Sequence, residues 1–321
     1  MRPTGTQLMV PSALVRVRCV TIESWQRRPG LLPAVRWAMA RPLRSIAKSG
    51  RLPKGRGLPA RATRRAAYLC GRAAHHIAWP TVEPGSQVVA RTPAGARVPL
   101  ASGTVLAWSL WLTGEFELQE LISAGRLALP GSCAFDVGAN VGLFAVDLSR
   151  AVGLTGRVIA IEPLTATAEL LRSNLEHNCC LNVEVVVAAA GAVAGQVELL
   201  LAHDPSQHST AMELPLGQIA QGSVKVPCVT LDDLWQGAGR PAVSFVKIDV
   251  EGAEEQVLLG ALAMITACRP PMIVEVHCPE RVGRLIALLP DYQSVAGPGF
   301  VSWNYLFRSA RPSVRPAVGV S

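Results

Sequence analysis

The stretch that most constrains the fold is Phe135–Phe144, which reads FDVGANVGLF. Apolar residues lead up to Asp136, two glycines bracket a turn, and an apolar, helix-compatible run follows. This pattern indicates a buried strand, a tight turn and a helix start. We expect such a turn to point free backbone N–H groups and the positive helix end at a ligand. Gly138 lets the backbone come close to that ligand, and the carboxylate of Asp136 can meet a cationic group.

A second landmark is Glu162, which ends the apolar strand Arg157–Glu162 and lies 24 residues beyond Gly138. In a nucleotide-binding βαβ unit, an acid near this spacing accepts hydrogen bonds from ribose hydroxyls. The sequence therefore predicts a nucleoside cofactor. Asn140 stands where the dinucleotide fingerprint G-x-G-x-x-G has its middle glycine. Asp136 would repel a pyrophosphate but suits the ammonium of a methionine moiety, which favours S-adenosylmethionine over NAD.

Three motifs, DVGANVG, IEP and FVKIDVEGAE (Phe245–Glu254), together resemble the FkbM-type methyltransferases. The resemblance covers about residues 93–308, and FVKIDVEGAE is its specific part. It implies an S-adenosylmethionine-dependent methyltransferase, in most cases one that methylates a hydroxyl of a sugar or natural product. It also implies an α/β class I methyltransferase (Rossmann-like) fold: a seven-stranded, mostly parallel sheet flanked by helices, with an antiparallel last strand.

The expected cofactor-binding residues lie on the glycine turn, after the second strand and after the third strand. They are Asp136, Gly138, Asn140, Gly142, Glu162, Pro163 and Ala189. The small residues Ala188–Gly191 would let an adenine ring lie flat, although tight helix packing explains them equally well. In the resembled family an acidic residue ahead of the glycine strand lies close to the cofactor pocket. Glu117 is therefore a candidate, with a surface helix as the alternative.

Charge is unevenly distributed along the 321 residues. Residues 1–80 hold 16 Lys and Arg against one acid, Glu23, a net +15, so the rest of the chain carries −7 against the +8 of the whole. This basic segment is interpreted as a chain started too early, with Met39 as a later start, as a disordered arm for a polyanion or membrane surface, or as an organellar targeting segment. Its apolar pieces are too short to span a membrane.

We divide the chain into a basic, disordered extension (1–80), an N-terminal cap (81–128), a methyltransferase domain (129–308) and a disordered tail (309–321). Strands are expected at 133–137, 158–162, 183–188, 245–250 and 272–277, with helices between them, which predicts a parallel sheet. Further strands are expected at 196–201 and 224–229, and a closing antiparallel pair at 291–295 and 301–307. Eight cysteines without a C-x-x-C pair indicate reduced thiols in a cytoplasmic protein.

The chemistry-bearing stretch is the strand Phe245–Val250, which places Lys247 and Asp249 on one face because side chains two apart point the same way. Glu251 follows at the strand end. Burying such charges is costly unless they are paired or used. A purely structural Lys247–Asp249 pair, with Glu251 and Glu254 as acids at a helix N-terminus, is the alternative.

The strand Met272–His277 carries Glu275 and His277 on one face. If it neighbours the strand 245–250, we expect Asp249, Glu251, Glu275 and His277 to converge at the edge of the sheet where ligands bind. The catalytic candidates are Asp249, His277, Lys247 and Glu251, with His277 and Asp249 as candidate bases. A divalent cation on Asp249 and Glu275 is an open alternative. The polar run His203–Met212 offers His203, His208 and Ser209 as substrate contacts.

The expected partner is a small-molecule or glycan hydroxyl acceptor, with no nucleic acid and no transmembrane segment. Three rival functions stay open. The βαβ unit alone would also suit an NAD-dependent oxidoreductase, and the basic extension would suit a nucleic-acid methyltransferase or binding module. The third is a protein that binds the cofactor without catalysis.

Overall fold

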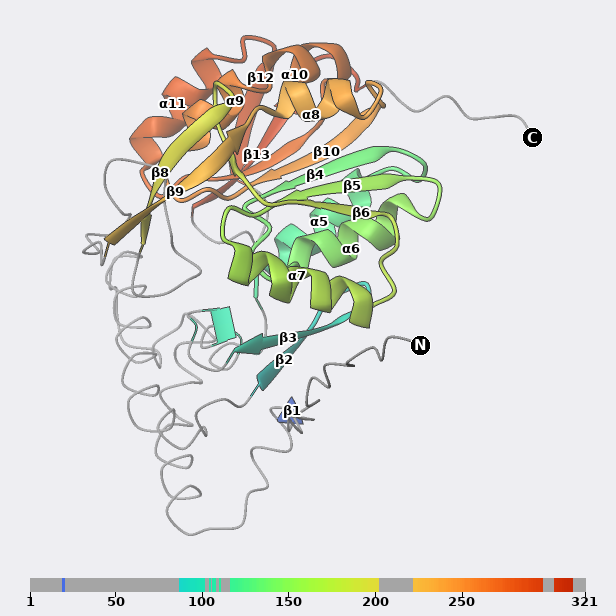
Figure 1. Ribbon diagram of the computed structural model, residues 1–321. Helices are drawn as coiled ribbons and strands as arrows, with labels where there is room; N and C mark the ends of the chain where they lie inside the picture. The colour runs from blue at the N-terminus through green and yellow to red at the C-terminus, as the bar shows by residue number, and fades with distance from the viewer. Residues whose placement is uncertain are drawn as a thin grey trace, which may run out of the picture.

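A computed structural model describes residues 19–20, 87–101, 104, 106–107, 110, 116–201, 222–296 and 303–313 (Figure 1). The strands are β1 Cys19–Val20, β2 Gln87–Arg91, β3 Arg97–Ala101, β4 Cys133–Val137, β5 Arg157–Ile161, β6 Val183–Val186, β7 Ala189–Ala190, β8 Gly195–Leu201, β9 Gly222–Val229, β10 Val243–Ile248, β11 Met272–Glu275, β12 Tyr292–Ala296 and β13 Asn304–Ser309. The helices are α5 Leu118–Leu127, α6 Leu143–Val152, α7 Thr165–His177, α8 Leu231–Gly237, α9 Glu254–Leu259, α10 Leu262–Cys268 and α11 Pro279–Ala287.

The central sheet has seven strands in the order β12-β13-β11-β10-β4-β5-β6. Neighbouring strands from β6 to β11 pair in parallel. The last strand, β13, runs antiparallel between β11 and β12. Along the chain, the parallel strands are added outwards from β4 on one side (β5, β6) and then from β10 on the other side (β11). In open α/β sheets, ligands bind in the crevice at the carboxyl ends of the two strands where this change of side occurs, here β4 and β10. The predicted class I methyltransferase fold is confirmed.

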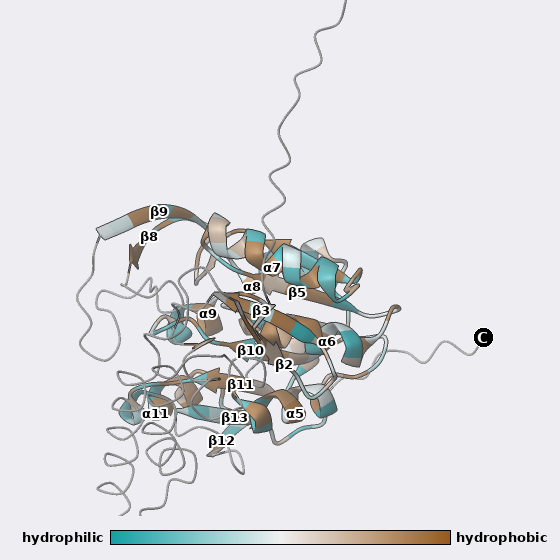
Figure 2. Ribbon diagram, turned by 90° about the horizontal axis from the view of Figure 1, so that it is seen from below, coloured by the Kyte–Doolittle hydropathy of each residue, from teal (hydrophilic) through white to brown (hydrophobic). Residues whose placement is uncertain are grey.

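Helices cover both faces of the sheet, and the strands between them are mostly apolar, with Asp136 in β4 and Lys247 in β10 as buried charged exceptions. Helices α8 to α11 pack on one face, against side chains such as Phe135 and Val246. Helices α5 and α6 pack on the other, against Phe245 and Ile273, and α7 lies beside α6 (Figure 1). In Figure 2 the central strands are largely hydrophobic, whereas α7 shows hydrophilic residues. A strand buried on both faces needs such a largely apolar sequence.

Two smaller sheets flank the central one. Strands β2 and β3 pair as an antiparallel hairpin, whose turn lies between Arg91 and Arg97. Asp147 in α6 holds this turn through bonds from the Thr92 hydroxyl and the Ala94 N–H. Strand β7 pairs with β9, which pairs in turn with β8, and the ribbon of β8 and β9 extends away from the sheet in Figure 2.

The predicted strands are present, and β5, β6, β10 and β11 end one or two residues earlier than predicted. Glu162 lies one residue beyond β5, and Asp249 and Val250 lie beyond β10. His277 lies two residues beyond β11, because the chain there turns into α11. The strand expected at 183–188 ends at Val186, after which Ala189–Ala190 pairs with β9 in a different sheet. These side chains therefore stand on loops at the carboxyl edge, where they are freer to face a ligand.

Several predictions lie outside the described residues. They concern nearly all of the extension 1–80, the end of the tail, and the candidates His203, His208 and Ser209. Within the described ranges, no helix has the length and apolar character that crossing a bilayer requires.

Candidate functional site

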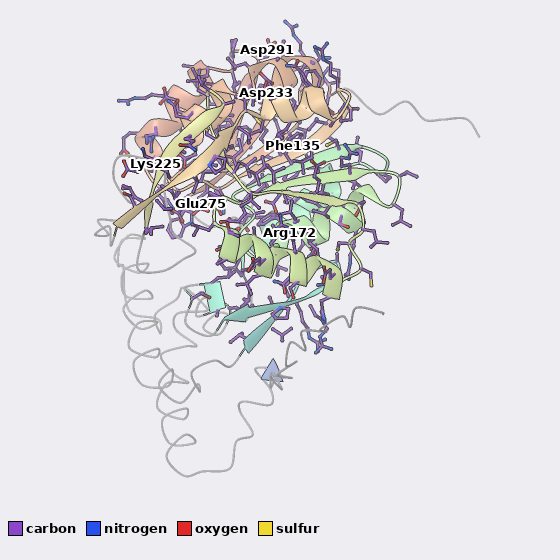
Figure 3. The ribbon with its side chains drawn as sticks, in the orientation of Figure 1. Phe135, Arg172, Lys225, Asp233, Glu275 and Asp291 are labelled. Carbon is purple, nitrogen blue, oxygen red and sulfur yellow. The ribbon has the colours of Figure 1, made fainter. Side chains whose placement is uncertain are left out.

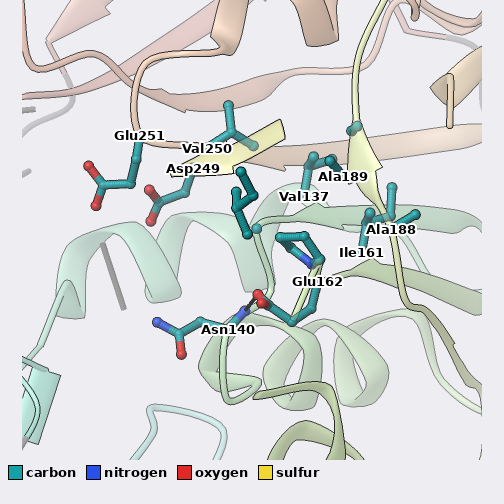
Figure 4. Close-up of a pocket in the computed structure, with 13 residues that line it drawn as sticks. Val137, Asn140, Ile161, Glu162, Ala188, Ala189, Asp249, Val250 and Glu251 are labelled. Carbon is teal, nitrogen blue, oxygen red and sulfur yellow. Dashed lines mark hydrogen bonds between the residues drawn. The ribbon is translucent and has the colours of Figure 1, made fainter. Parts of the chain in front are cut away.

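A cleft that is open to solvent lies at the carboxyl edge of β4, β5 and β10, with about 610 Å³ of empty space when the solvent at its mouth is included. Its lining comes from the glycine turn, the ends of β5 and β10, and the segment around β7; the residues are Val137, Gly138, Asn140, Ile161, Glu162, Pro163, Ala188, Ala189, Ala190, Leu199, Asp249, Val250 and Glu251. Figure 4 shows Asp249 and Glu251 on one side of the cleft and Glu162 with Asn140 on another. The charged residues that line it are all acids.

The glycine turn after β4 takes backbone angles that favour glycine. Gly138 and Gly142 have φ values of 79° and 96°, and Asn140 between them has φ 49°. A Cβ on Gly138 would lie 1.7 Å from the carbonyl oxygen of Asp249. Gly138 is therefore required for the close approach of the turn to the end of β10, rather than for approach to a ligand alone.

The expectation that this turn offers free N–H groups to a ligand is wrong at four of its positions. The N–H groups of Gly138 and Ala139 both donate to the carbonyl of Ile161, at 2.9 Å each, and that of Gly142 donates to Ala139. The N–H of Asn140 donates to Glu162 at 3.1 Å. The physical reason is that the turn folds back over the end of β5, which satisfies its donors internally.

Glu162 faces the cleft with a fixed orientation. Its Oε2 accepts from the Asn140 N–H at 3.1 Å (Figure 4). Its Oε1 accepts from the Leu164 N–H, also at 3.1 Å. Burial raises the pKa of Glu162 to about 7, against the lowering effect of these two bonds. Each carboxylate oxygen keeps a further lone pair, so Glu162 can still accept hydrogen bonds from hydroxyl groups in the cleft.

Lys247 lies beneath the edge of the sheet, with 1% of its side chain exposed. Its Nζ is 3.7 Å from Asp249 and 3.9 Å from Glu275. The third carboxylate is that of Glu117, at 4.0 Å, and the Nζ also donates to the Asn304 side chain at 3.1 Å. It lies 5.2 Å above the ring of Phe144 in α6. The expected Lys247–Asp249 pair is present, but as one contact of a larger cluster.

The cluster holds more acidic than basic groups, and their pKa values reflect it. Burial raises the pKa of Glu117 and of Asp136 to about 7, although Lys247 lowers both. Burial and the charge of Asp249 raise the pKa of Glu275. Burial alone would lower the pKa of Lys247, but the surrounding carboxylates raise it. Lys247 therefore stays charged, and the acids around it hold protons more tightly than exposed acids do.

His277 binds two of the carboxylates. Its Nε2 lies 2.9 Å from Glu251 and 3.2 Å from Glu275, so these side chains converge at one edge as predicted. Figure 3 places Glu275 at this edge and Phe135 inside the sheet. Burial would lower the pKa of His277, but the hydrogen bond and charge of Glu251 raise it. The ring packs at 47° to Trp303, with 5.6 Å between centroids.

A model of the methyltransferase FkbM domain matches residues 136–295. The chain belongs to the FkbM methyltransferase family. No curated protein sequence matches it. Among solved structures, a methyltransferase FkbM from Methylobacillus flagellatus KT is similar at 18% identity and a TM-score of 0.39, over 63% of this chain and 52% of that one, about half its length.

Two further structures are similar to this chain. An rRNA methylase from Streptococcus thermophilus matches with 8% identity and a TM-score of 0.38, over 61% of this chain and 98% of its own. Fibrillarin from Aeropyrum pernix, with natively bound S-adenosyl-L-methionine, matches with 12% identity and a TM-score of 0.38, over 59% of this chain and 73% of its own.

The FkbM domain brings most of the predicted residues to the cleft. Gly138, Asn140, Glu162, Pro163, Ala189, Asp249 and Glu251 line it, whereas Asp136, Gly142, Lys247, Glu275 and His277 are not among its lining residues. The carboxylate of Asp136 points towards α6 and accepts a bond from the Ala145 N–H, and its Oδ2 is buried without a hydrogen-bond partner.

The sequence analysis missed Asn304, the amide that joins Lys247 to Glu117. Its Oδ1 accepts from Lys247, and its Nδ2 donates to Glu117 at 2.8 Å. Asn304 and Glu117 both lie outside the matched residues 136–295. The available signal was a polar residue in the apolar strand written WNYLF. Among the residues that the structure describes, no group of three or more His, Cys, Asp and Glu is arranged to hold a metal ion.

Proposed function

We propose that this FkbM methyltransferase uses S-adenosylmethionine to methylate a hydroxyl of a small molecule, sugar or glycan. One observation carries the proposal: a single cleft has Glu162 and small alanines on one side and the carboxylates of Asp249 and Glu251 on the other. The first set suits a nucleoside, and the second suits a positively charged donor beside an acceptor that must lose a proton.

The cleft residues fit the donor. Glu162 would accept hydrogen bonds from the ribose hydroxyls, and Ala188 and Ala189 leave room for a flat ring. When bound, S-adenosylmethionine supplies a methyl group activated by its sulfonium, whose positive charge the acids of the cleft complement. Glu162 and the glycine turn would hold the nucleoside.

The acceptor hydroxyl must lose its proton as the C–S bond of the donor breaks and the new C–O bond forms. Glu251 faces the cleft and is hydrogen-bonded to His277, so this pair would take the proton. A positioned base contributes about 10²–10⁴-fold to such a reaction. Asp249, whose side chain is 28% exposed and paired with Lys247, would orient the acceptor.

The position of Lys247 makes a divalent cation between Asp249 and Glu275 unnecessary. Its ammonium already supplies a cation within 4.0 Å of Asp249 and Glu275, the two carboxylates considered as metal ligands. We therefore expect methyl transfer without added divalent cation.

Two rival functions fit this cleft less well. A pyrophosphate of NAD would need free N–H groups on the glycine turn, but those of Gly138 and Ala139 are bonded to Ile161. A nucleic acid would bring phosphates to a cleft whose charged lining residues are Glu162, Asp249 and Glu251. Charge repulsion disfavours both ligands.

The test is a transfer assay with the full-length chain and radiolabelled S-adenosylmethionine. Neutral polyhydroxyl compounds, phosphorylated compounds and bulk RNA are offered separately, with and without magnesium. We expect transfer to a neutral hydroxyl compound, independent of magnesium and reduced about 100-fold or more by Glu251→Gln. Preferential methylation of RNA, undiminished by Glu251→Gln, would contradict the proposal.

A further inference from the structure

The turn that presents Glu251 to the cleft has an unusual backbone. Glu251 has φ 52° and Gly252 has φ 110°. Residues other than glycine seldom adopt a positive φ. Of the six such residues in the described part of the chain, Cys179, Arg240 and Arg269 lie just after helix ends, and Glu117 directly precedes α5. The other two, Asn140 and Glu251, both line the cleft. Backbone outliers that gather at a site point to a function for that geometry.

Glu254 and Arg281 hold this turn from behind. The N–H of Gly252 donates to Glu254 Oε1 at 2.6 Å, and its carbonyl accepts from the Arg281 guanidinium at 2.8 Å. Arg281 and Glu254 also form an ion pair at 3.7 Å. The backbone N–H and carbonyl of Gly252 are therefore both hydrogen-bonded to members of the same ion pair. The Gly252 N–H belongs to the peptide plane that leaves Glu251, so this bond fixes the backbone angle ψ of Glu251.

The held turn determines where the Glu251 side chain points. Glu251 lines the cleft, and its Oε2 lies 2.9 Å from His277. Neither Glu254 nor Arg281 lines the cleft. An acid in the first turn of a helix is ordinarily exposed to solvent, but Glu254 in the first turn of α9 is only 2% exposed. Burying its charge requires a partner, and Arg281 from α11 is that partner.

We propose that Glu254 and Arg281 are positioning residues that hold Glu251 against His277 in the geometry for proton removal. This role rests on the proposed function, because it assumes that the Glu251–His277 pair takes the proton. It also explains the spacing of the EGAE motif: the second acid returns to bind the glycine that follows the first.

The structural half of the proposal has a direct spectroscopic test. Glu251–Gly252 is the only Glu-Gly pair in the sequence, so full-length protein labelled with ¹³C-carbonyl Glu and ¹⁵N-Gly gives one cross-peak, that of the Gly252 amide. We expect this peak to move in Arg281→Gln and in Glu254→Gln. Two matched controls, Arg284→Gln on α11 and Glu255→Gln in the first turn of α9, should leave it in place. An unchanged peak position in Arg281→Gln would contradict the proposal that Glu254 and Arg281 hold the backbone at Gly252.

The functional half is tested by kinetics on the same variants. We expect Arg281→Gln to lower kcat for methyl transfer about 10- to 100-fold, the scale expected for a misplaced catalytic group. The KM for the donor should change less than about two-fold, because the donor side of the cleft is untouched. Arg281→Lys and added guanidinium should each restore part of kcat. Active wild type with a fully active Arg281→Gln would overturn the positioning role, whereas wild type without any methyl transfer would overturn the proposed function instead.

Discussion

Replacing Lys247 by methionine should strongly destabilise the protein. The Lys247 ammonium is fully buried and lies 3.7–4.0 Å from Asp249, Glu275 and Glu117. At an effective dielectric constant of about 20, each such contact is an attraction of about 4 kcal/mol, much of which offsets the cost of burying the charges. Removing one partner of a buried ion pair typically costs about 3–5 kcal/mol. We expect a loss of that size at pH 8.

The pH dependence gives the sign of the effect. The carboxyls of Glu117 and Asp136 have pKa values raised from 4.5 and 3.8 to about 7. A folded state with raised acid pKa values binds protons more tightly than the unfolded state, so stability falls as pH rises towards 7. Without Lys247 these pKa values rise further. The variant should therefore lose more stability at pH 8 than at pH 5.

Thermal unfolding followed by circular dichroism measures both effects. For a domain of this size, 1 kcal/mol corresponds to about 2–4 °C in Tm, so Lys247→Met should lower Tm by about 6–20 °C at pH 8. The double variant Lys247→Met/Glu117→Gln should recover part of that loss, because it also removes an unpaired charge. A Tm at pH 8 within about 2 °C of wild type would refute the claim that Lys247 neutralises the cluster.

Three further predictions concern the cleft. Glu162→Ala should raise the Kd for S-adenosylmethionine about 10- to 100-fold, because hydrogen bonds to a charged group contribute about 1.5–3 kcal/mol; calorimetry measures it, and an unchanged Kd would remove Glu162 from the donor site. Gly138→Ala should lower Tm by more than about 5 °C, because its Cβ would meet the Asp249 carbonyl at 1.7 Å. Gly125→Ala, a helical glycine with open space around it, is the control and should keep or raise Tm. The kcat/KM for methyl transfer should rise with pH through a pKa above 6.5, because the Glu251–His277 pair must release its proton to act as base and the pKa of His277 is raised; a rate that falls over this range would contradict that role.

Local patterns in the sequence were sufficient for the strands and the loops that follow them. The apolar runs before Asp136 and around Phe245 predicted β4 and β10. Convergence of Glu251 and His277 followed from the expectation that two parallel strands are neighbours. These predictions succeeded because they depend on spacing within one element or between adjacent strands.

The rest of the site depends on contacts between distant parts of the chain. Asn304 reaches Lys247 across 57 residues and Glu117 across 187, and no local pattern encodes such a meeting. Arg281 was missed for the same reason, since an arginine on an amphipathic helix is ordinarily a surface residue. The glycine turn was misjudged differently: its donors are satisfied by the end of β5, a contact that only the folded sheet creates.

The central claim is that the cleft binds S-adenosylmethionine, and isothermal calorimetry of the full-length chain tests it most directly. S-adenosylmethionine, its demethylated product and NAD are titrated separately, with and without magnesium. The account predicts micromolar binding of the first two, independent of magnesium, and none of NAD. Binding of NAD in place of S-adenosylmethionine, or binding of neither by folded protein, would contradict it.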